Sequence, residues 1–173
     1  MRDFGIILQA RSASKRFPKK IYKQINKKSI LEILLERVRK IKTLKIIVAT
    51  TIYSRDDKIT KLSNKMGVLN FRGREKDVLS RYYFCAKKYK LKHIIRLTGD
   101  CPLIDPSLIK KMIKIYKKTK IDYLSNTVPI NKSRYPNGSD IEIFSMDALK
   151  KNFQNCKSKF DREHVTNFFY KKK

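Results

Sequence analysis

Cysteine is scarce in this sequence of 173 residues, and tryptophan is missing altogether. The three cysteines, Cys85, Cys101 and Cys156, are odd in number and form no Cys-x-x-Cys or Cys/His spacing. A disulfide framework needs paired cysteines, and a structural zinc site needs closely spaced cysteine or histidine ligands. The sequence therefore argues against both kinds of site.

Long apolar runs and glycine-rich nucleotide motifs are also missing. No stretch is long and apolar enough to span a membrane, and Arg2 and Asp3 interrupt the N-terminus early, unlike a signal peptide. We therefore expect a cytoplasmic protein without a membrane span. The sequence contains neither the GxxxxGK[ST] motif of P-loop proteins nor the GxGxxG fingerprint of dinucleotide-binding folds. Any nucleotide site must be built from other residues.

Acidic residues are few, with 15 Asp and Glu against 43 Lys and Arg, which gives a formal charge of +28. Such a charge is typical of nucleic-acid-binding proteins. The alternative is a set of lysines spread over solvated faces. We favour the alternative, because the basic residues recur as Lys-Lys pairs in every expected helix and no RNA-recognition or helix-turn-helix pattern occurs. Diffuse charge affects solubility and steering, and polyanions should be attracted nonspecifically at low salt.

The sequence does contain an alternation of short apolar runs with amphipathic segments. Strands are expected at residues 4–8, 46–50, 68–71, 93–97, 121–125 and 141–144. Helices are expected to begin near Ser29, Ser54, Asp77, Asp105 and Ser145, with a last helix over residues 161–170. This order predicts an α/β protein with three α/β/α layers, in which helices cover both faces of a mainly parallel sheet. We expect one domain over residues 1–173.

The stretch that we call the first loop, residues 9–20, follows the first expected strand. It contains Arg11 and Arg16, two serines, and the adjacent lysines Lys19 and Lys20. Ligands of open α/β sheets bind at the carboxyl ends of strands, where this loop begins. Because lysine and arginine neutralise and hydrogen-bond phosphate groups, the loop favours a polyphosphate ligand.

Two more strand ends should meet the first loop at the same edge of the sheet. They are Ala49-Thr50 and Thr98-Gly99-Asp100. A carboxylate opposite a cationic loop suits a magnesium–nucleotide complex, since Mg²⁺ uses one or two carboxylates together with phosphate oxygens. Gly99 would allow a close approach of backbone and ligand. Asp100 could instead only close a turn, but this alternative leaves the arginines of the first loop unexplained.

Two further residues leave alternatives open. Cys101 could be a nucleophile, but no base lies near it in the sequence, so a buried thiol is the favoured interpretation. His164 is one of only two histidines. It is compatible with a metal or general-base role and equally with a hydrogen-bonded position at the rim of a site.

Taken together, collinear motifs over nearly the whole chain resemble the sugar-acid cytidylyltransferases, which include the acylneuraminate and 3-deoxy-manno-octulosonate enzymes. The opening signature is Arg11-x-x-Ser14-x-Arg16-Phe17-Pro18-x-Lys20. The other matching stretches are residues 48–51, 71–73, 77–83, 96–106, 122–127, 138–145 and 161–166. They are most similar to the branch that contains the spore-coat polysaccharide biosynthesis protein F.

The resemblance implies a Rossmann-like fold of the nucleotide-diphospho-sugar transferase type. It also implies transfer of CMP from CTP to a sugar-acid hydroxyl with release of pyrophosphate, Mg²⁺ as cofactor, a role in surface polysaccharide synthesis, and a possible homodimer. By matching position, the catalytic residues would be Arg11, Arg16, Lys20 and Asp100. Nucleotide-binding residues would be Ala10, Arg11, Ser14, Lys20, Ala49, Thr50, Arg72, Thr98 and Gly99. Acceptor-binding residues would be Asn126, Asp140, Glu142 and His164, and metal ligands Asp100 and Asp140.

The sequence departs from the family pattern in two places. Lys19 stands where the family usually has a glycine before the signature lysine, so its side chain would crowd the phosphates or add a cation. Family members also usually continue to an Asp-Thr-Pro-Glu-Asp-like segment that supplies a second metal carboxylate, and this sequence ends before it. We therefore expect a domain without that segment. Either Asp140 or Glu142 replaces the missing carboxylate, or the shortened form is inactive.

Overall fold

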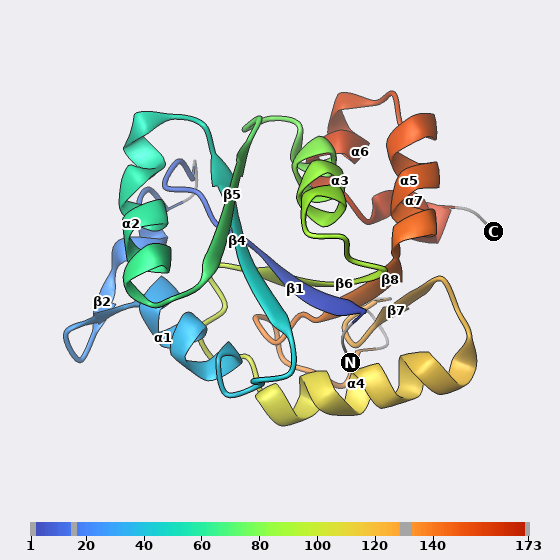
Figure 1. Cartoon of the computed structure of the whole chain (residues 1–173), viewed down its shortest axis with the longest axis horizontal. Coiled ribbons are helices and arrows are strands. Elements are labelled where there is room, and N and C mark those ends of the chain that lie inside the picture. The colour runs from blue at the N-terminus through green and yellow to red at the C-terminus, as the bar shows by residue number, and fades with distance from the viewer. Residues whose placement is uncertain (1–2, 15–16, 129–132, 172–173) are drawn as a thin grey trace.

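A six-stranded sheet forms the centre of the computed structural model, which describes residues 3–14, 17–128 and 133–171 (Figure 1). Its strand order is β5-β4-β1-β6-β8-β7. The strands are β1 (Phe4–Gln9), β4 (Lys45–Thr51), β5 (Leu69–Gly73), β6 (His93–Thr98), β7 (Tyr123–Ser125) and β8 (Glu142–Ser145). β1 pairs in parallel with β4 and β6, and β4 pairs in parallel with β5. β8 is antiparallel to both of its neighbours, so the predicted mainly parallel sheet is confirmed.

Helices cover both faces of this sheet. One face carries α1 (Ile30–Val38), α2 (Asp57–Lys65) and α4 (Pro106–Thr119), and the other carries α3 (Val78–Lys88), α5 (Met146–Asn155), α6 (Lys159–His164) and α7 (Asn167–Lys171) (Figure 1). Side chains of a strand alternate between its faces. In β1, Ile6 and Leu8 accordingly join one buried cluster, and Ile7 joins the other. The predicted three-layer fold is confirmed.

Local capping signals set the start of most helices. Ser29 and Glu32 form a capping box at α1, and Asp77 caps α3 through the Ser80 amide. The last helix was expected over residues 161–170, and this prediction is wrong. α6 begins at Lys159 and ends at His164, because Val165 has a positive φ of 46° that a continuing helix cannot accommodate.

A small hairpin after the first loop was not predicted. A short 3₁₀ turn, η1 (Lys20–Tyr22), leads into β2 (Gln24–Ile25) and β3 (Lys28–Ser29). Asn26 and Lys27 between the two strands have φ values of 48° and 64°. Two successive positive φ angles are what a type I′ hairpin turn requires. The hairpin connects the first loop to α1.

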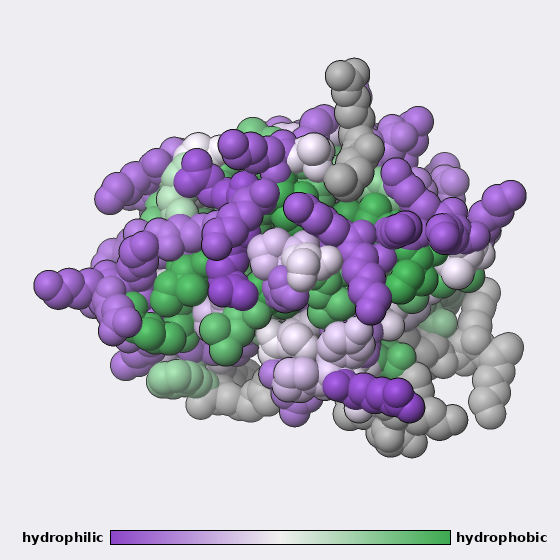
Figure 2. Space-filling model, turned by 90° about the horizontal axis from the view of Figure 1, so that it is seen from below, coloured by the Kyte–Doolittle hydropathy of each residue, from purple (hydrophilic) through white to green (hydrophobic). Residues whose placement is uncertain are grey.

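Basic residues are spread over the outside of the molecule. The exposed face of α4, for example, carries Lys110, Lys111, Lys114, Lys117 and Lys118. Figure 2, seen from the side on which α4 lies, shows hydrophilic side chains distributed over this face with apolar surface between them. Within the part of the chain that the structure describes, we find no helix with the length and apolarity needed to cross a membrane.

Candidate active site

A cleft of about 1480 Å³ lies at the carboxyl ends of β1 and β6. The chain runs outward from β1 to β4 and β5 and then returns across β1 to β6, so the strand order reverses beside β1. Ligands of open α/β sheets bind at such a reversal. The cleft is lined by residues from the first loop, from the turn after β6, from the segment after β5 and from α6: Gln9–Ser14, Pro18–Tyr22, Thr98–Asp100, Glu75–Asp77, Lys159 and Arg162–His164, with Arg55 and Lys58 at its side.

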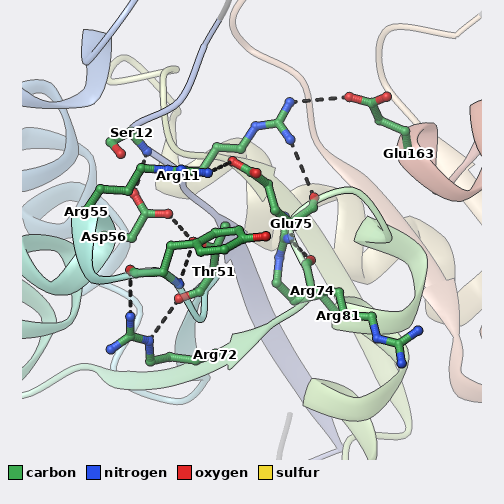
Figure 3. Close-up of polar contacts among 11 residues, drawn as sticks. Arg11, Ser12, Thr51, Arg55, Asp56, Arg72, Arg74, Glu75, Arg81 and Glu163 are labelled. Carbon is green, nitrogen blue, oxygen red and sulfur yellow. Dashed lines mark hydrogen bonds and ion pairs between the residues drawn. The ribbon is translucent and has the colours of Figure 1, made fainter.

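Backbone hydrogen bonds close the first loop at its base. The Ser12 carbonyl accepts from the Lys19 amide at 3.0 Å, and the Ala10 amide donates to the Ala49 carbonyl at 3.2 Å. The Ser12 amide donates to the carboxylate of Asp56 at 2.8 Å (Figure 3). Asp56 is fully buried and accepts a second hydrogen bond from the Thr51 hydroxyl. The base of the loop is therefore attached to the end of β4 and to the turn before α2.

Lys19 stands where the resemblance to the sugar-acid cytidylyltransferases leads us to expect a glycine. Its φ is 55° and its ψ is 22°, which is the left-handed conformation that residues other than glycine adopt at a cost. The departure from the family pattern therefore concerns the backbone first. The Lys19 residue nevertheless lines the cleft, so the substitution also adds a cation there.

Gly99 brings the first loop and the turn after β6 into contact. Its amide donates to the Gln9 carbonyl at 2.7 Å. A Cβ atom at Gly99 would lie 2.9 Å from both the Gln9 carbonyl oxygen and the Ala10 Cβ. A larger residue would force the two segments apart. The sequence suggested a close approach to a ligand, whereas the close approach seen in the structure is between the two loops.

Lys20 and Asp100 form an ion pair across the cleft. The two side chains are 27% and 32% exposed, so both can reach a ligand. Burial pushes the pKa of Asp100 up, but the hydrogen bond and positive charge of Lys20 outweigh burial, and the pKa lies below its ordinary value. Asp100 is therefore a carboxylate at neutral pH.

Arg11 reaches across the cleft mouth. Its guanidinium donates to the Glu75 carbonyl at 3.5 Å and pairs with the Glu163 carboxylate at 3.3 Å (Figure 3). The Glu75 carboxylate in turn pairs with Arg55 at 2.6 Å. Arg11 thus contacts both the segment after β5 and α6.

A buried arginine supports the segment after β5. Arg81 is fully buried and donates to the carbonyls of Arg74 and Glu75, at 2.5 and 3.3 Å. Burial lowers the pKa of Arg81 to about 10, so the guanidinium is still charged at neutral pH. A Cβ at Gly73 would lie 3.1 Å from the Arg81 Cγ, so the glycine leaves room for this side chain.

α6 reaches the cleft because Arg162 attaches it to α3. Arg162 pairs with the helix-capping Asp77 at 2.7 Å and donates to the Cys156 carbonyl at 2.9 Å. These contacts place Glu163 and His164 in the cleft wall. Sequence reasoning noticed the Asp-Arg-Glu-His motif but missed the pair with Asp77, which lies 85 positions away.

Most of the expected nucleotide-binding residues line this cleft, and three do not. Ala49 and Thr50 are fully buried in β4. The Arg72 guanidinium donates to the Thr51 carbonyl at 2.9 Å and pairs with Asp57 at 2.7 Å, so it supports the turn after β4. The expected catalytic residue Arg16 lies outside the described residues.

Of the expected acceptor-binding residues, only His164 lines the cleft. Asn126 joins two backbone segments, since its side chain donates to the Ser139 carbonyl and accepts from the Ile141 amide, both at 2.8 Å. Asp140 accepts from the Gly138 amide at 3.0 Å. Glu142 is buried, pairs with Arg96, and accepts from the Tyr123 hydroxyl at 2.6 Å. Its oxygens are already engaged within the sheet.

The described residues contain no group of three His, Cys, Asp or Glu side chains that could hold a metal ion. Burial raises the pKa of the Cys101 thiol, and the negative charges of Asp100 and Asp140 raise it further. This raised pKa supports a thiol at Cys101 rather than a nucleophile. One or two carboxylates, completed by phosphate oxygens and water, are the usual protein contribution to a Mg²⁺ site. Asp100 in the cleft fits such a site.

The cytidylyltransferase family model matches residues 5–173. The chain belongs to the cytidylyltransferase family. This membership makes it one of a family of nucleotidyltransferases and confirms the resemblance found in the sequence.

Similar proteins agree with this assignment. An uncharacterized protein, MJ1063, from Methanocaldococcus jannaschii is 46% identical over 171 residues, covering 98% of this chain and 68% of the relative. The spore coat polysaccharide biosynthesis protein SpsF of Bacillus subtilis is 35% identical over 128 residues, 71% of this chain and 53% of its own length. A 3-deoxy-manno-octulosonate cytidylyltransferase from Blochmanniella floridana is 29% identical over 134 residues, 71% of this chain and 50% of its own length.

Among solved structures, a cytidylyltransferase from Leptospira borgpetersenii has a TM-score of 0.92 and 35% sequence identity, and the match covers 99% of this chain and 72% of that one. This chain therefore spans about half to three quarters of the length of these relatives.

Proposed function

We propose that this protein transfers CMP from CTP to a hydroxyl group of a sugar acid and releases pyrophosphate, as a step in surface polysaccharide synthesis. The observation that carries the proposal is the cleft in which Arg11 and Lys20, from the end of β1, face Asp100, from the end of β6. Cations and a carboxylate are the groups that a metal–triphosphate complex requires. The names of the SpsF and 3-deoxy-manno-octulosonate relatives support the choice of nucleotide and acceptor.

The first loop would hold the triphosphate. Lys20 and Arg11 lie on opposite sides of it, each paired with an acidic residue from another wall of the cleft. When pyrophosphate leaves, negative charge develops on its oxygens, and fixed cations stabilise that charge. Arg16, from the same signature, stays a prediction for the same task. Ser14, Thr98 and Gly99 line the cleft beside these cations and would contact the nucleotide.

Asp100 would hold Mg²⁺, with Asp140 as the second carboxylate. The ion, when bound, would supply positive charge that neutralises part of the charge of the triphosphate. We prefer Asp140 to Glu142 because Glu142 is already bound by Arg96 and Tyr123. Lys20 would then exchange its contact with Asp100 for one with a phosphate oxygen.

The acceptor would enter beside α6, where His164 lines the cleft. Acceptor contacts from Asn126 and nucleoside contacts from Ala49, Thr50 and Arg72 stay predictions. Asn126 and Arg72 hold neighbouring backbone segments, and Ala49 and Thr50 are buried in β4. The homodimer that the resemblance implies also stays a prediction, which light scattering of the purified chain can check.

The experiment that tests the proposed function measures binding first and turnover second. CTP with Mg²⁺ should raise the melting temperature at 150 mM salt, whereas ATP and inorganic triphosphate should raise it much less. These two controls are needed because a chain of charge +28 attracts any polyanion. Pyrophosphate should then appear when the matching sugar acid is supplied, with 3-deoxy-manno-octulosonate and acylneuraminate as first candidates.

Equal increases in melting temperature with CTP, ATP and inorganic triphosphate would indicate that the cleft binds anions nonspecifically. Selective CTP binding without pyrophosphate release across a broad panel of sugar acids would instead indicate a nucleotide-binding homologue without transferase activity.

A further inference from the structure

Asp56 is a buried carboxylate close to the candidate active site but outside the cleft lining. It lies in the short 3₁₀ turn η2 (Ser54–Asp56) between β4 and α2, and none of its surface is exposed. A carboxylate is rarely buried unless its oxygens are hydrogen-bonded. Here one oxygen accepts from the Ser12 amide at 2.8 Å, and the other accepts from the Thr51 hydroxyl.

The bond to Ser12 links Asp56 to the first loop. Ser12 follows Arg11 directly, and its carbonyl accepts from the Lys19 amide, the residue before Lys20. Ser12 is therefore the point at which the two sides of the loop meet. A carboxylate that holds this point fixes where Arg11 leaves the loop and where Lys20 begins η1. The side chain of Asp56 makes no contact with the cleft itself.

The turn that carries Asp56 is itself well supported. Arg72 donates to the Thr51 carbonyl at 2.9 Å (Figure 3). It also donates to the Tyr53 carbonyl at 2.8 Å and pairs with Asp57. The same turn carries Arg55, which pairs with Glu75, the residue whose carbonyl accepts from Arg11. The turn after β4 therefore contacts Ser12, the residue after Arg11, through Asp56, and it contacts Glu75, a hydrogen-bond partner of Arg11, through Arg55.

We propose that Asp56 is a positioning residue for the triphosphate site: by holding the Ser12 amide, it keeps the first loop in the conformation that presents Arg11 and Lys20 to the nucleotide. The part of this inference that concerns CTP rests on the proposed function. The part that concerns the order of the loop in the ligand-free protein does not.

Three variants test the inference. Asp56→Ala removes both hydrogen bonds. Asp56→Asn is the conservative variant, because its amide oxygen can accept from Ser12 while its NH₂ group donates to Thr51. Thr51→Val keeps the side-chain volume nearly unchanged and removes one of the two bonds. The matched control is Glu36→Ala, which removes an exposed carboxylate whose partner is Lys28.

The first readout is hydrogen–deuterium exchange of the ligand-free protein. In Asp56→Ala, amides of the first loop should exchange about tenfold faster or more, because a hydrogen bond to a charged acceptor is lost. Exchange in β6 and α4 should be unchanged. Asp56→Asn should restore most of the protection, Thr51→Val should give a smaller increase, and Glu36→Ala should give none in the first loop.

The second readout is kinetic. Asp56→Ala should raise the KM for CTP by about tenfold to a hundredfold, with little change in the KM for the acceptor, and Asp56→Asn should recover most of the loss. If Asp56→Ala does not fold, the test uses Thr51→Val and Asp56→Asn instead. The two variants are then compared by the exchange rate of the first loop and by the KM for CTP.

A uniform fall in stability in the Asp56 and Thr51 variants, without faster exchange in the first loop, would overturn the inference. So would an unchanged KM for CTP in a variant whose loop exchanges faster. A wild-type protein that fails to bind CTP overturns the proposed function instead, and the exchange experiment still decides whether Asp56 orders the loop.

Discussion

Two ion pairs, one within β6 and one just after it, each join a basic side chain to a carboxylate but differ in their surroundings. Arg96, within the strand, pairs with Glu142 of β8, and Asp100, just after the strand, pairs with Lys20. The side chains of Arg96 and Glu142 are 17% and 6% exposed, whereas those of Lys20 and Asp100 are 27% and 32% exposed and both line the cleft. The first pair is part of the sheet, and the second faces the space where a ligand would bind.

The comparison shows that forming an ion pair does not by itself indicate whether a charged residue is structural or binds a ligand. Whether its side chain lines the cleft is the more informative observation. Glu142 is held by Arg96 and Tyr123, and leaving that pair would strand a buried charge. Asp100 and Lys20 can instead exchange partners when a ligand binds. Lys20 can pair with a phosphate group in place of Asp100, and Asp100 can bind a metal ion in place of Lys20. The two pairs should therefore respond to mutation in opposite ways.

The largest expected effect comes from Asp100→Asn. Turnover should fall by about a thousandfold or more, because the carboxylate that we propose as a metal ligand is lost, while the fold stays intact. In EDTA, however, the variant should bind CTP more tightly than the wild type, because Lys20 no longer has a carboxylate partner that competes with the triphosphate. Pyrophosphate release measures the first effect, and calorimetry without metal measures the second.

The matched control for this experiment is Glu36→Gln, which breaks the exposed Lys28–Glu36 pair on the surface. It should change neither turnover nor CTP affinity. Weaker metal-free binding in Asp100→Asn would show that the Lys20–Asp100 pair does not compete with the nucleotide, and unchanged turnover would remove Asp100 from the metal site.

Glu142→Ala should lower the stability of the fold and leave nucleotide binding unchanged. Removing one partner of a buried ion pair costs about 3–5 kcal/mol, because the Arg96 guanidinium is left without its carboxylate. Urea unfolding measures this loss, and Glu142→Gln should lose less because it keeps hydrogen-bonding capacity. CTP affinity of the folded protein should be unchanged. A raised KM for the acceptor with normal stability would instead restore the acceptor role expected from the sequence.

Much of the fold was predictable, because its determinants are local. Short apolar runs marked the strands, and short polar signals such as Ser29 with Glu32 marked helix starts. The failures were places where backbone conformation departs from what the residue type suggests. Val165 has a positive φ and ends α6, although β-branched residues rarely adopt this conformation. The hairpin of β2 and β3 is too short to show periodicity.

The candidate site was predictable where it lies at strand ends. The first loop and Asp100 meet in the cleft, as parallel strands require. The supporting residues could not be found in this way, because their partners are distant in sequence. Asp56 holds Ser12 from 44 positions away, and the pair of Asp77 with Arg162 spans 85 positions. Tertiary packing brings them together, because α2 packs against the sheet and α6 packs against α3.

The pH dependence of stability gives a smaller test of the Lys20–Asp100 pair. The pKa of Asp100 is lowered in the folded protein, so the carboxylate contributes stability above its ordinary pKa of about 4. That contribution should be lost as the pH falls through the lower folded value. The difference in unfolding free energy between wild type and Asp100→Asn, about 1 kcal/mol or less for a partly exposed pair, should therefore be constant from pH 7 to 5 and vanish in stronger acid. A difference in unfolding free energy that does not decrease as the pH is lowered would show that it comes from packing and not from the ion pair.

The smallest expected effect concerns Lys19, and it separates backbone strain from charge within the cleft. Lys19 and Lys120 both have left-handed backbone, with φ values of 55° and 50°, but only Lys19 lines the cleft. Replacing either residue by glycine removes a strain of about 1–2 kcal/mol and adds flexibility to the unfolded chain worth about 0.5–1 kcal/mol. Each variant should therefore gain roughly 0.5 kcal/mol in urea unfolding. Lys120→Gly should leave CTP affinity unchanged, whereas Lys19→Gly should weaken it slightly at low salt, since one cation of the cleft is lost. If both variants bind CTP equally, Lys19 acts through the backbone alone.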